Sequence, residues 1–219
     1  MHHEPGVKFT YSEELDVLGY MIEKLSGLPL DRFFKERIFD PLGTEDSYFY
    51  LPDSKIEGLV AVQTREDGKW ITFPSSPYYD PDNPIKGAKR FFSGGGGLSS
   101  SAEDYSNFFQ MYLNQGTFNG KRLLSRTTVQ LIMANQVGDL LGESGAYYGL
   151  AFGVLDKSGE GMGRRGSAGT FDWGGYFNTQ YFADPKEQVI GILMKQTQDT
   201  PADETGWKFR QLVFQAIDD

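Results

Sequence analysis

Two short stretches of the sequence carry residue types that could do chemistry. Tyr11 and Ser12 stand before a stretch with helical spacing, where the positive end of a helix dipole can lower the proton affinity of a phenol. Trp173, Gly174 and Gly175 stand at the predicted entry to a strand, where a substrate can approach the backbone and the next amide can point at a developing oxyanion. Taken alone, the first stretch is more typical of packing beside a helix, and the second of a turn with a core tryptophan.

Other catalytic signatures are absent from the sequence. There is no Gly-x-Ser-x-Gly motif, and a triad of serine, histidine and aspartate would need His2 or His3, which lie at the loose N-terminal end. The glycine run at 94–97 lacks the Gly-Lys-Ser or Gly-Lys-Thr ending of a phosphate loop. Asp80 and Asp82 lack the glycine and the distal glutamate of a calcium loop. We therefore expect no bound metal and no cofactor.

The composition excludes further classes of function. The net charge is −9 without a lysine-rich or arginine-rich stripe, which disfavours nucleic-acid and anionic-membrane partners. The chain has no cysteine, which excludes disulfides, thiolate metal sites and a cysteine nucleophile. No stretch approaches the ~18 apolar residues of a membrane span, and the N-terminal sequence lacks the basic and apolar regions of an export signal. As written, nothing exports the chain from the cytoplasm, and the composition leaves the compartment open.

A helix is predicted directly after the stretch that contains Tyr11 and Ser12. Apolar residues at spacings of three and four predict an amphipathic helix over 15–25, next to Tyr11. Thr10 and Glu13 have the spacing of a capping box at its start, and Gly27 stands where a helix ends. This helix would position the phenol.

The remaining chain alternates between helical and strand-like spacing. We expect a second short helix over 30–38, a strand over 59–62 and a proline-rich loop over 74–84. Two helices are expected next, over 102–112 and 125–133. Three strands over 148–155, 176–183 and 189–194 and a closing helix over 207–216 complete the chain. The glycine run at 94–97 is expected to be a flexible turn that leads into a capped helix. This mixture predicts an α+β fold.

Several motifs along the chain resemble, in the same order, those of class C β-lactamases, D,D-peptidases and related esterases. They are Glu4-Pro5-Gly6, Phe9-Thr10-Tyr11-Ser12, Asp16-Val17-Leu18-Gly19, Glu23-Lys24-Leu25-Ser26-Gly27, Ile38-Phe39-Asp40-Pro41-Leu42-Gly43, Ser93 to Ser100, Tyr148-Gly149-Leu150 and Trp173-Gly174-Gly175. The resemblance covers nearly the whole chain and is strongest to the esterase branch of the family.

This resemblance implies an α+β fold of the β-lactamase and transpeptidase type, with a helical region beside an antiparallel sheet that is flanked by helices. Residues 1–219 would form a single domain without its N-terminal part, in which 1–135 are mostly helical and 145–219 form the sheet and the C-terminal helix. Without N-terminal strands and an N-terminal helix, a strand edge and an apolar face would be exposed. We therefore expect self-association through the exposed sheet edge, or binding of a missing N-terminal segment.

The resemblance also implies roles for single residues. Tyr11 corresponds to the general acid or base, and Ser12 belongs to the same substrate-binding motif. The Trp-Gly-Gly motif at 173–175 corresponds to the strand on the opposite wall, and the amide of Tyr176 to one oxyanion donor. Glu13 replaces the asparagine of many relatives, and the tryptophan of the motif replaces their lysine. Both changes weaken recognition of a β-lactam carboxylate and favour a small ester as the substrate.

The nucleophile of the family lies in a Ser-x-x-Lys motif, upstream of the tyrosine. No lysine of this sequence has a serine three positions before it. Because the serine cannot be activated without that lysine, we expect no family-type hydrolase activity from these residues alone. The leading interpretation is a fragment of a serine hydrolase that cleaves esters or amides through an acyl-enzyme. The alternatives are a non-catalytic ligand-binding remnant of the fold and one half of a split enzyme. Members of the family are often periplasmic or exported.

Overall fold

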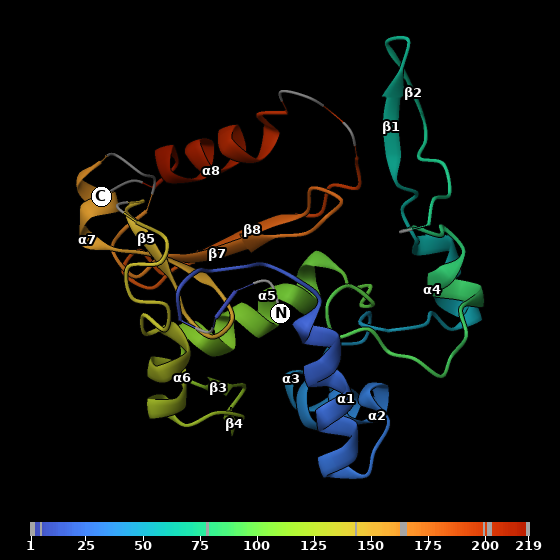
Figure 1. Ribbon diagram of the computed structural model, residues 1–219, viewed down its shortest axis with the longest axis horizontal. Coiled ribbons are helices and arrows are strands. Elements are labelled where there is room, and N and C mark those ends of the chain that lie inside the picture. Colours follow the sequence, from blue (N-terminus) through green and yellow to red (C-terminus); the bar gives the residue numbers. More distant parts are fainter. Residues whose placement is uncertain are drawn as a thin grey trace.

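The computed structural model describes residues 3–4, 6–77, 79–142, 144–162, 166–198, 200 and 203–217. His2 was considered above as a base, Pro5 belongs to a motif, and Tyr78 falls in the predicted proline-rich loop; all three lie outside the described residues. Helices and antiparallel strands share the chain (Figure 1), which confirms the predicted α+β class.

A five-stranded antiparallel sheet forms the centre of the C-terminal part. Its order is β5-β6-β7-β8-β9, so that each strand pairs with its neighbour in the sequence. Hairpins join all pairs except β6 and β7, whose longer connection contains α7 (Lys157–Gly161). The strands are β5 (Ala146–Tyr148), β6 (Gly153–Leu155), β7 (Phe171–Gly174), β8 (Gln180–Asp184) and β9 (Val189–Leu193).

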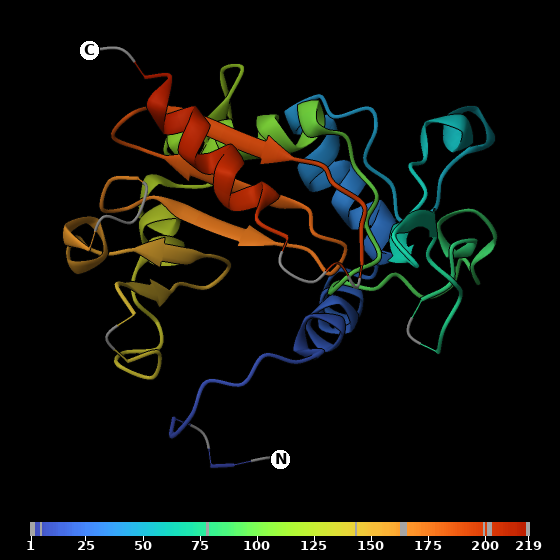
Figure 2. The same cartoon turned by 90° about the horizontal axis from the view of Figure 1, so that it is seen from above.

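Helices lie on both faces of this sheet (Figures 1 and 2). α5 (Ala102–Leu113) packs against β8 and β9 on one face, and α8 (Thr205–Gln215) lies on the other. Because side chains alternate along a strand, Tyr181 points to α5, whereas Phe182 stacks on Phe214 of α8. A buried core cluster joins the α5 face of the sheet to the helical region. Its members are Leu42, Phe109, Met111, Tyr112, Leu113, Val129, Phe152, Val154, Phe171 and Ala183.

Helices also make up most of the regular structure before the sheet. They are α1 (Glu14–Ser26), α2 (Leu30–Phe34), the π-helical turn η1 (Lys35–Phe39), α3 (Asp40–Leu42), the 3₁₀ turn η2 (Asp53–Gly58), α4 (Asn83–Lys86) and α6 (Arg126–Met133). Ser101 and Ser125 cap α5 and α6. The side-chain oxygen of Ser101 accepts a hydrogen bond from the Asp104 N–H, and that of Ser125 accepts one from the Thr128 N–H. The predicted capped helix after the glycine run is therefore confirmed.

Two small hairpins complete the fold: β1 (Gln63–Glu66) with β2 (Lys69–Thr72), and β3 (Thr117–Phe118) with β4 (Lys121–Arg122). The first projects from the body of the molecule (Figure 1). The predicted strand over 59–62 is wrong, because pairing starts one residue later. Asp67 and Gly68, with φ of 49° and 76°, form the turn that sets this register.

Two other strands differ from their predictions. Residues 148–155 form the β5–β6 hairpin instead of one strand, because the Gly149 N–H donates to the Phe152 carbonyl at 2.9 Å and closes a turn. β8 begins at Gln180 and not at Tyr176. The Trp-Gly-Gly motif therefore lies at the end of β7, and its prediction as the entry to a strand is corrected.

α1 forms where it was expected, but its start differs from the prediction. Glu13 is the N-cap residue and makes no side-chain cap bond, so the predicted capping box is wrong. The Thr10 hydroxyl instead lies 2.6 Å from Nε2 of His3, which engages it outside the helix. Gly27 ends the helix with a left-handed φ of 71°, as predicted.

The predicted apolar face of α1 is largely uncovered by the described residues. Leu15, Leu18 and Leu25 are 45%, 50% and 85% exposed, and Gly19 is the buried residue of this helix. An apolar stripe usually stabilises a helix by packing on a neighbour. This face is therefore available for contact with further protein.

Candidate active site

Tyr11 and Trp173 meet in the fold. Tyr11 lies in the segment before α1 and Trp173 in β7, and their ring centroids are 5.8 Å apart with planes inclined at 36°. In Figure 1 the N-terminal segment (blue) crosses in front of the strands of the sheet (orange). Tyr11 remains 63% exposed, so its hydroxyl is accessible to a ligand. The structure thus brings the two predicted stretches together on one surface.

Two more aromatic rings extend this contact. Tyr148, at the end of β5, lies with its ring centroid 5.0 Å from that of Trp173, and Phe9 lies 5.3 Å from Tyr148. Burial raises the pKa of Tyr148 above its ordinary value, and the charge of an ionised Tyr11 would raise it further. The sequence analysis placed Tyr148 in a strand and in a motif of the resemblance, but gave it no role in the site. Its position beside Trp173 follows from the pairing of β5, β6 and β7, which the sequence pattern did not supply.

β7 ends at Gly174, and Gly175 begins the turn that follows it. The Gly175 N–H donates to the Thr179 carbonyl at 2.9 Å, and Asn178 adopts a left-handed φ of 64°. A Cβ atom on Gly175 would lie 2.2 Å from Oγ1 of Thr179, so any other residue there requires the Thr179 hydroxyl to move. Tyr176 is 66% exposed, and its backbone N–H has no acceptor among the described residues. This amide can donate to a ligand.

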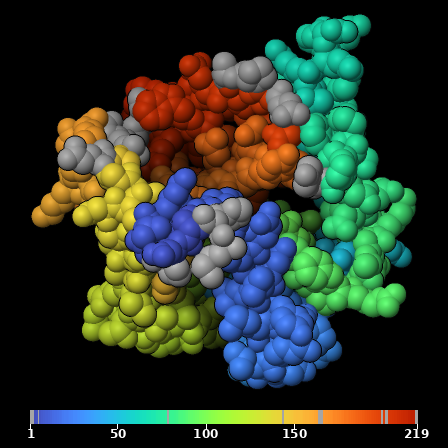
Figure 3. All heavy atoms as spheres, viewed as in Figure 1, coloured from blue at the N-terminus to red at the C-terminus, as the bar shows by residue number. Residues whose placement is uncertain are grey.

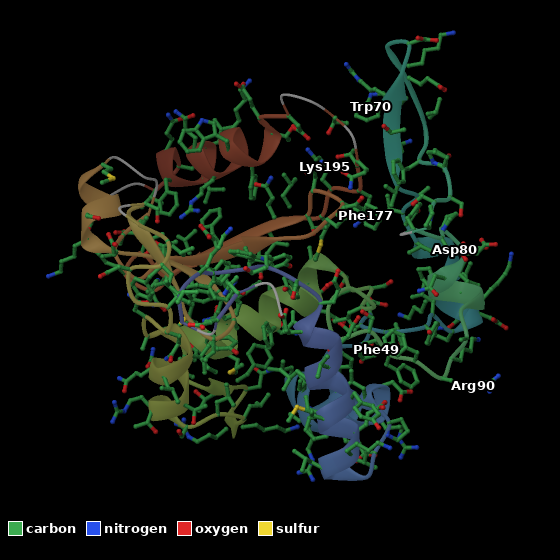
Figure 4. The ribbon with its side chains drawn as sticks, in the orientation of Figure 1. Phe49, Trp70, Asp80, Arg90, Phe177 and Lys195 are labelled. Atoms are coloured by element: carbon green, nitrogen blue, oxygen red, sulfur yellow. The ribbon has the colours of Figure 1, made fainter. Side chains whose placement is uncertain are left out.

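Phe177, in the same turn, joins it to the loop before α4. Its ring centroid lies 4.9 Å from that of Tyr79, which in turn packs on Phe73. Phe177 is labelled in Figure 4, near the base of the β1–β2 hairpin. The predicted loop over 74–84 therefore borders the turn that carries the candidate oxyanion donor.

The hydroxyl of Ser12 donates to the carboxylate of Glu14 in the first turn of α1. No hydrogen bond joins Ser12 to the strand motif within the described part of the chain. Of the predicted site residues, Tyr11 and Trp173 are in ring contact, Gly174 and Gly175 continue directly from Trp173, and Ser12 is engaged by its own helix.

The sequence analysis missed Asp16 as a residue that positions the site. Its carboxylate accepts hydrogen bonds from the Ser93 hydroxyl at 2.7 Å and from the Gly95 N–H at 3.0 Å. A Cβ atom on Gly94 would lie only 2.4 Å from the Leu15 carbonyl oxygen. The glycine run thus docks on the first turn of α1, close to Tyr11. A run of residues without side chains could have signalled this close approach of two backbones.

On the face of the sheet that points away from Tyr11, an ion pair between Asp172 and Arg210 joins β7 to α8. The Arg210 guanidinium also lies 4.9 Å from the ring centroid of Phe182. Because neighbouring side chains alternate, Asp172 points to α8 while Trp173 points to Tyr11. A cavity of ≈ 440 Å³ lies between the β7–β8 hairpin and α8, and Figure 3 shows a hollow between these orange and red segments.

The described residues contain no group of three or more His, Cys, Asp or Glu side chains that could hold a metal. His3 is engaged by Thr10 and by the Glu4 carbonyl, whose oxygen lies 3.0 Å from Nδ1 of His3.

None of the described helices is long and apolar enough to cross a membrane.

Comparison with protein families gives a match over nearly the whole chain. The sequence model of the family described as Beta-lactamase matches residues 1–215. Protein Rv1367c of Mycobacterium tuberculosis is 30% identical over 207 residues, which are 89% of this chain and 50% of that protein. A protein of Escherichia coli (strain K12) named "Putative D-alanyl-D-alanine carboxypeptidase" is 26% identical over 214 residues, which are 92% and 48% of the two. The chain spans about half the length of these curated relatives.

Solved structures share the fold. EstCE1, described as a hydrolase with promiscuous acyltransferase activity, has a TM-score of 0.82 at 23% identity, covering 97% of this chain and 57% of that one. Simvastatin synthase (LovD) from Aspergillus terreus has a TM-score of 0.75 at 20% identity, covering 97% and 55%. The fold is therefore of the β-lactamase and transpeptidase type, as the sequence analysis predicted.

Proposed function

Because this chain belongs to the β-lactamase family of serine hydrolases, we propose that its 219 residues form part of an active site that cleaves small esters or amides through an acyl-enzyme. The ring contact between Tyr11 and Trp173 carries this proposal. It sets an exposed phenol opposite the end of a strand, where an amide N–H is available to a substrate.

In the proposed reaction, a serine oxygen attacks the carbonyl carbon of the substrate. Tyr11 relays the serine proton to the leaving alcohol or amine as the bond between carbonyl carbon and leaving group breaks. The carbonyl oxygen, which becomes negatively charged, accepts a hydrogen bond from the Tyr176 N–H. Water then attacks the carbonyl carbon of the acyl-enzyme, and the bond from that carbon to the serine oxygen breaks. Tyr11 relays the proton that water loses to the serine oxygen, and the carboxylic acid leaves.

The serine is the part that these residues do not supply, since they contain no Ser-x-x-Lys motif. We place the nucleophile on a segment outside the 219 residues, in line with relatives that are about twice as long. The 219 residues would therefore be inactive alone.

Two uncovered surfaces support a further segment. One is the apolar face of α1, which begins beside Tyr11 and exposes Leu15 and Leu18. The other is the outer edge of β9, which pairs with β8 alone among the described strands. Both surfaces are of the kind that proteins cover with helices and strands.

The surroundings of Tyr11 favour a neutral acyl group over an anionic one. Phe9, Tyr148 and Trp173 present aromatic surface beside the phenol. No lysine or arginine stacks on these rings within the described ranges. A β-lactam or peptide carboxylate would lose water against these rings, whereas an apolar ester buries its acyl chain there.

The proposal is tested with p-nitrophenyl acetate on the 219-residue chain, alone and with an added Ser-x-x-Lys segment from a similar esterase. Acylation of the added serine is followed by mass spectrometry. Tyr11→Phe is compared with Tyr20→Phe, which changes an exposed tyrosine of α1. We expect no turnover by the chain alone, an acyl adduct after complementation, and an adduct rate lowered about 10²-fold or more by Tyr11→Phe only.

If the unmodified chain without the added segment hydrolyses p-nitrophenyl acetate faster than Tyr11→Phe does, the placement of the nucleophile outside the 219 residues is overturned. Equal adduct rates for the two variants would overturn the role of Tyr11. Saturable binding of an ester without any adduct would favour the alternative, a ligand-binding remnant of the fold.

A further inference from the structure

The turn between β7 and β8, residues 175–179, carries the candidate oxyanion donor, the N–H of Tyr176. Two hydrogen bonds shape this turn. The Gly175 N–H donates to the Thr179 carbonyl at 2.9 Å, and the Asn178 N–H donates to the Gly175 carbonyl at 3.0 Å. A hairpin loop of this kind typically ends in a residue with a left-handed φ, most often glycine. Asn178 occupies that position with a φ of 64°.

The hydrogen bond to the Gly175 carbonyl sets the direction of the Tyr176 N–H. The two groups belong to one peptide unit, and in a planar trans peptide the C=O and the N–H point in opposite directions. Because the Gly175 carbonyl points into the turn toward Asn178, the N–H of Tyr176 points out of it. Whatever holds Asn178 in place therefore also orients the candidate donor.

The side-chain amide of Asn178 anchors the turn to the segment that follows β9. Its Nδ2 donates to the carbonyl and the hydroxyl of Thr197, at 3.1 Å and 3.0 Å, and lies 3.4 Å from the hydroxyl of Thr200. The Thr197 N–H donates back to the Phe177 carbonyl at 2.9 Å. Figure 4 labels Phe177 in the turn and Lys195 in the segment. Because Thr197 is only 7% exposed, these bonds are shielded from water and are strengthened by it.

The segment that receives this amide is itself held by the first residue of β1. The Gln63 N–H donates to the Gln196 carbonyl at 3.0 Å, and the Gln198 N–H donates to the Gln63 carbonyl at 2.9 Å. Asn178 therefore ties the turn to backbone that is already fixed. A glycine would suit the left-handed φ equally well but could not form this link.

We propose that Asn178 is a positioning residue, which holds the N–H of Tyr176 toward the carbonyl oxygen of the substrate. This inference rests on the proposed function, because it assigns a role within the same active site. Asn178 acts through the peptide unit between Gly175 and Tyr176 and does not touch the substrate. An oxyanion donor lowers the barrier only when it already points at the oxygen. Loss of the anchor should therefore lower the rate of acylation while the chain stays folded.

Nitrogen-15 relaxation of the 219-residue chain measures the order of the Tyr176 N–H without any reaction. Asn178→Gly keeps the left-handed φ and removes the side-chain amide. Asn119→Gly is the matched control, because Asn119 has a left-handed φ of 45° in the exposed turn between β3 and β4. Thr197→Val, which removes one acceptor of the anchor, is a milder second variant. Circular dichroism checks that each variant is folded.

We expect an order parameter of about 0.85 for the Tyr176 N–H in the wild type and in Asn119→Gly, and one below about 0.6 in Asn178→Gly. Thr197→Val should give an intermediate value. An order parameter below about 0.6 already in the wild type, or an unchanged one in Asn178→Gly, would overturn the proposal. If Asn178→Gly does not fold, an unchanged value in Thr197→Val overturns it instead.

Acylation of the added Ser-x-x-Lys segment tests the role of Asn178 in the reaction. p-Nitrophenyl acetate is compared with its thiono analogue, in which sulfur, a weaker hydrogen-bond acceptor, replaces the carbonyl oxygen. The ratio of the two adduct rates reports a donor that points at the oxygen, whereas a general structural loss lowers both rates alike. We expect this ratio to fall about tenfold or more in Asn178→Gly and to stay unchanged in Asn119→Gly.

The outcomes separate this inference from the proposed function. An adduct in the wild type, with the same ratio in Asn178→Gly as in Asn119→Gly, would overturn the role of Asn178 and leave the hydrolase reaction standing. Absence of any adduct in the wild type would overturn the proposed function, and with it the role in the reaction. In that case the order parameter still decides whether Asn178 holds the Tyr176 amide.

Discussion

The carboxylate of Asp16 accepts a hydrogen bond of 2.7 Å from the hydroxyl of Ser93 and so fixes the first turn of α1 to the glycine run. This contact connects the segment of Tyr11 to the residues that lead into α5. The backbone of the run lies so close to α1 that a Cβ atom on Gly94 would meet the Leu15 carbonyl oxygen at 2.4 Å. The position of the candidate phenol thus depends on a residue with no side chain.

Gly94→Ala should lower the free energy of unfolding by about 1–3 kcal/mol, because the new methyl group forces the two backbones apart. Gly96→Ala is the matched control, since a Cβ atom there has no neighbour within 4 Å. Urea unfolding at neutral pH measures both. Equal stability of the two variants would contradict the close docking of the run on α1.

The sequence predicted the helices and strands of the chain better than the contacts between them. Helical spacing correctly placed α1, α5 and α6, since a helix depends on residues near one another in the sequence. It did not reveal that Asp16 reaches Ser93, because that contact joins segments far apart in the sequence. Strand ends were also misplaced where a turn, such as the one after Gly175, interrupts a run of strand-forming residues.

Asp184→Asn should destabilise the fold by about 2–4 kcal/mol. The buried carboxylate accepts hydrogen bonds from the N–H groups of Ser167, Lys186 and Glu187 and from the hydroxyl of Thr170, at 2.7 to 3.0 Å. An asparagine can accept at one oxygen only. Urea unfolding of this variant is compared with that of Asp53→Asn, which changes an exposed carboxylate and should have little effect.

The effect of Asp184→Asn should also depend on pH. Burial alone would raise the pKa of Asp184, but its hydrogen bonds outweigh burial and hold the pKa below the ordinary value. The carboxylate therefore contributes its full stability above about pH 4, the ordinary aspartate range, and loses it as the pH falls through the lowered pKa. A difference between wild type and variant that grows on acidification would contradict this.

We propose that the uncovered surfaces cause self-association of the 219-residue chain. The outer edge of β9 and the apolar face of α1 would both be buried between two copies. Leu18→Glu should weaken the association about tenfold or more, whereas Val60→Glu, at an exposed site elsewhere, should not. Light scattering after size-exclusion chromatography gives the mass. A monomer at the highest soluble concentration would count against the proposal.

The candidate site itself could be predicted only in part. The motif order pointed to Tyr11 and to Trp173, and the fold sets their rings in contact. Tyr148 was missed as a neighbour of Trp173, because the β5–β6 hairpin was read as one strand. The amide of Tyr176 was predicted as an oxyanion donor, but its place in the turn after β7 was not, because the motif was interpreted as the entry to a strand.

The proximity of Tyr11 and Trp173 is the central claim, and nuclear Overhauser effects between their ring protons test it most directly. Tyr148 and Trp173, with centroids 5.0 Å apart within the sheet, provide an internal reference. We expect cross-peaks from Trp173 to both tyrosines, with the Tyr11 peak abolished in Tyr11→Leu. A clear Tyr148 cross-peak without any from Tyr11 would show that the phenol does not face the strand, and would contradict the proposed site.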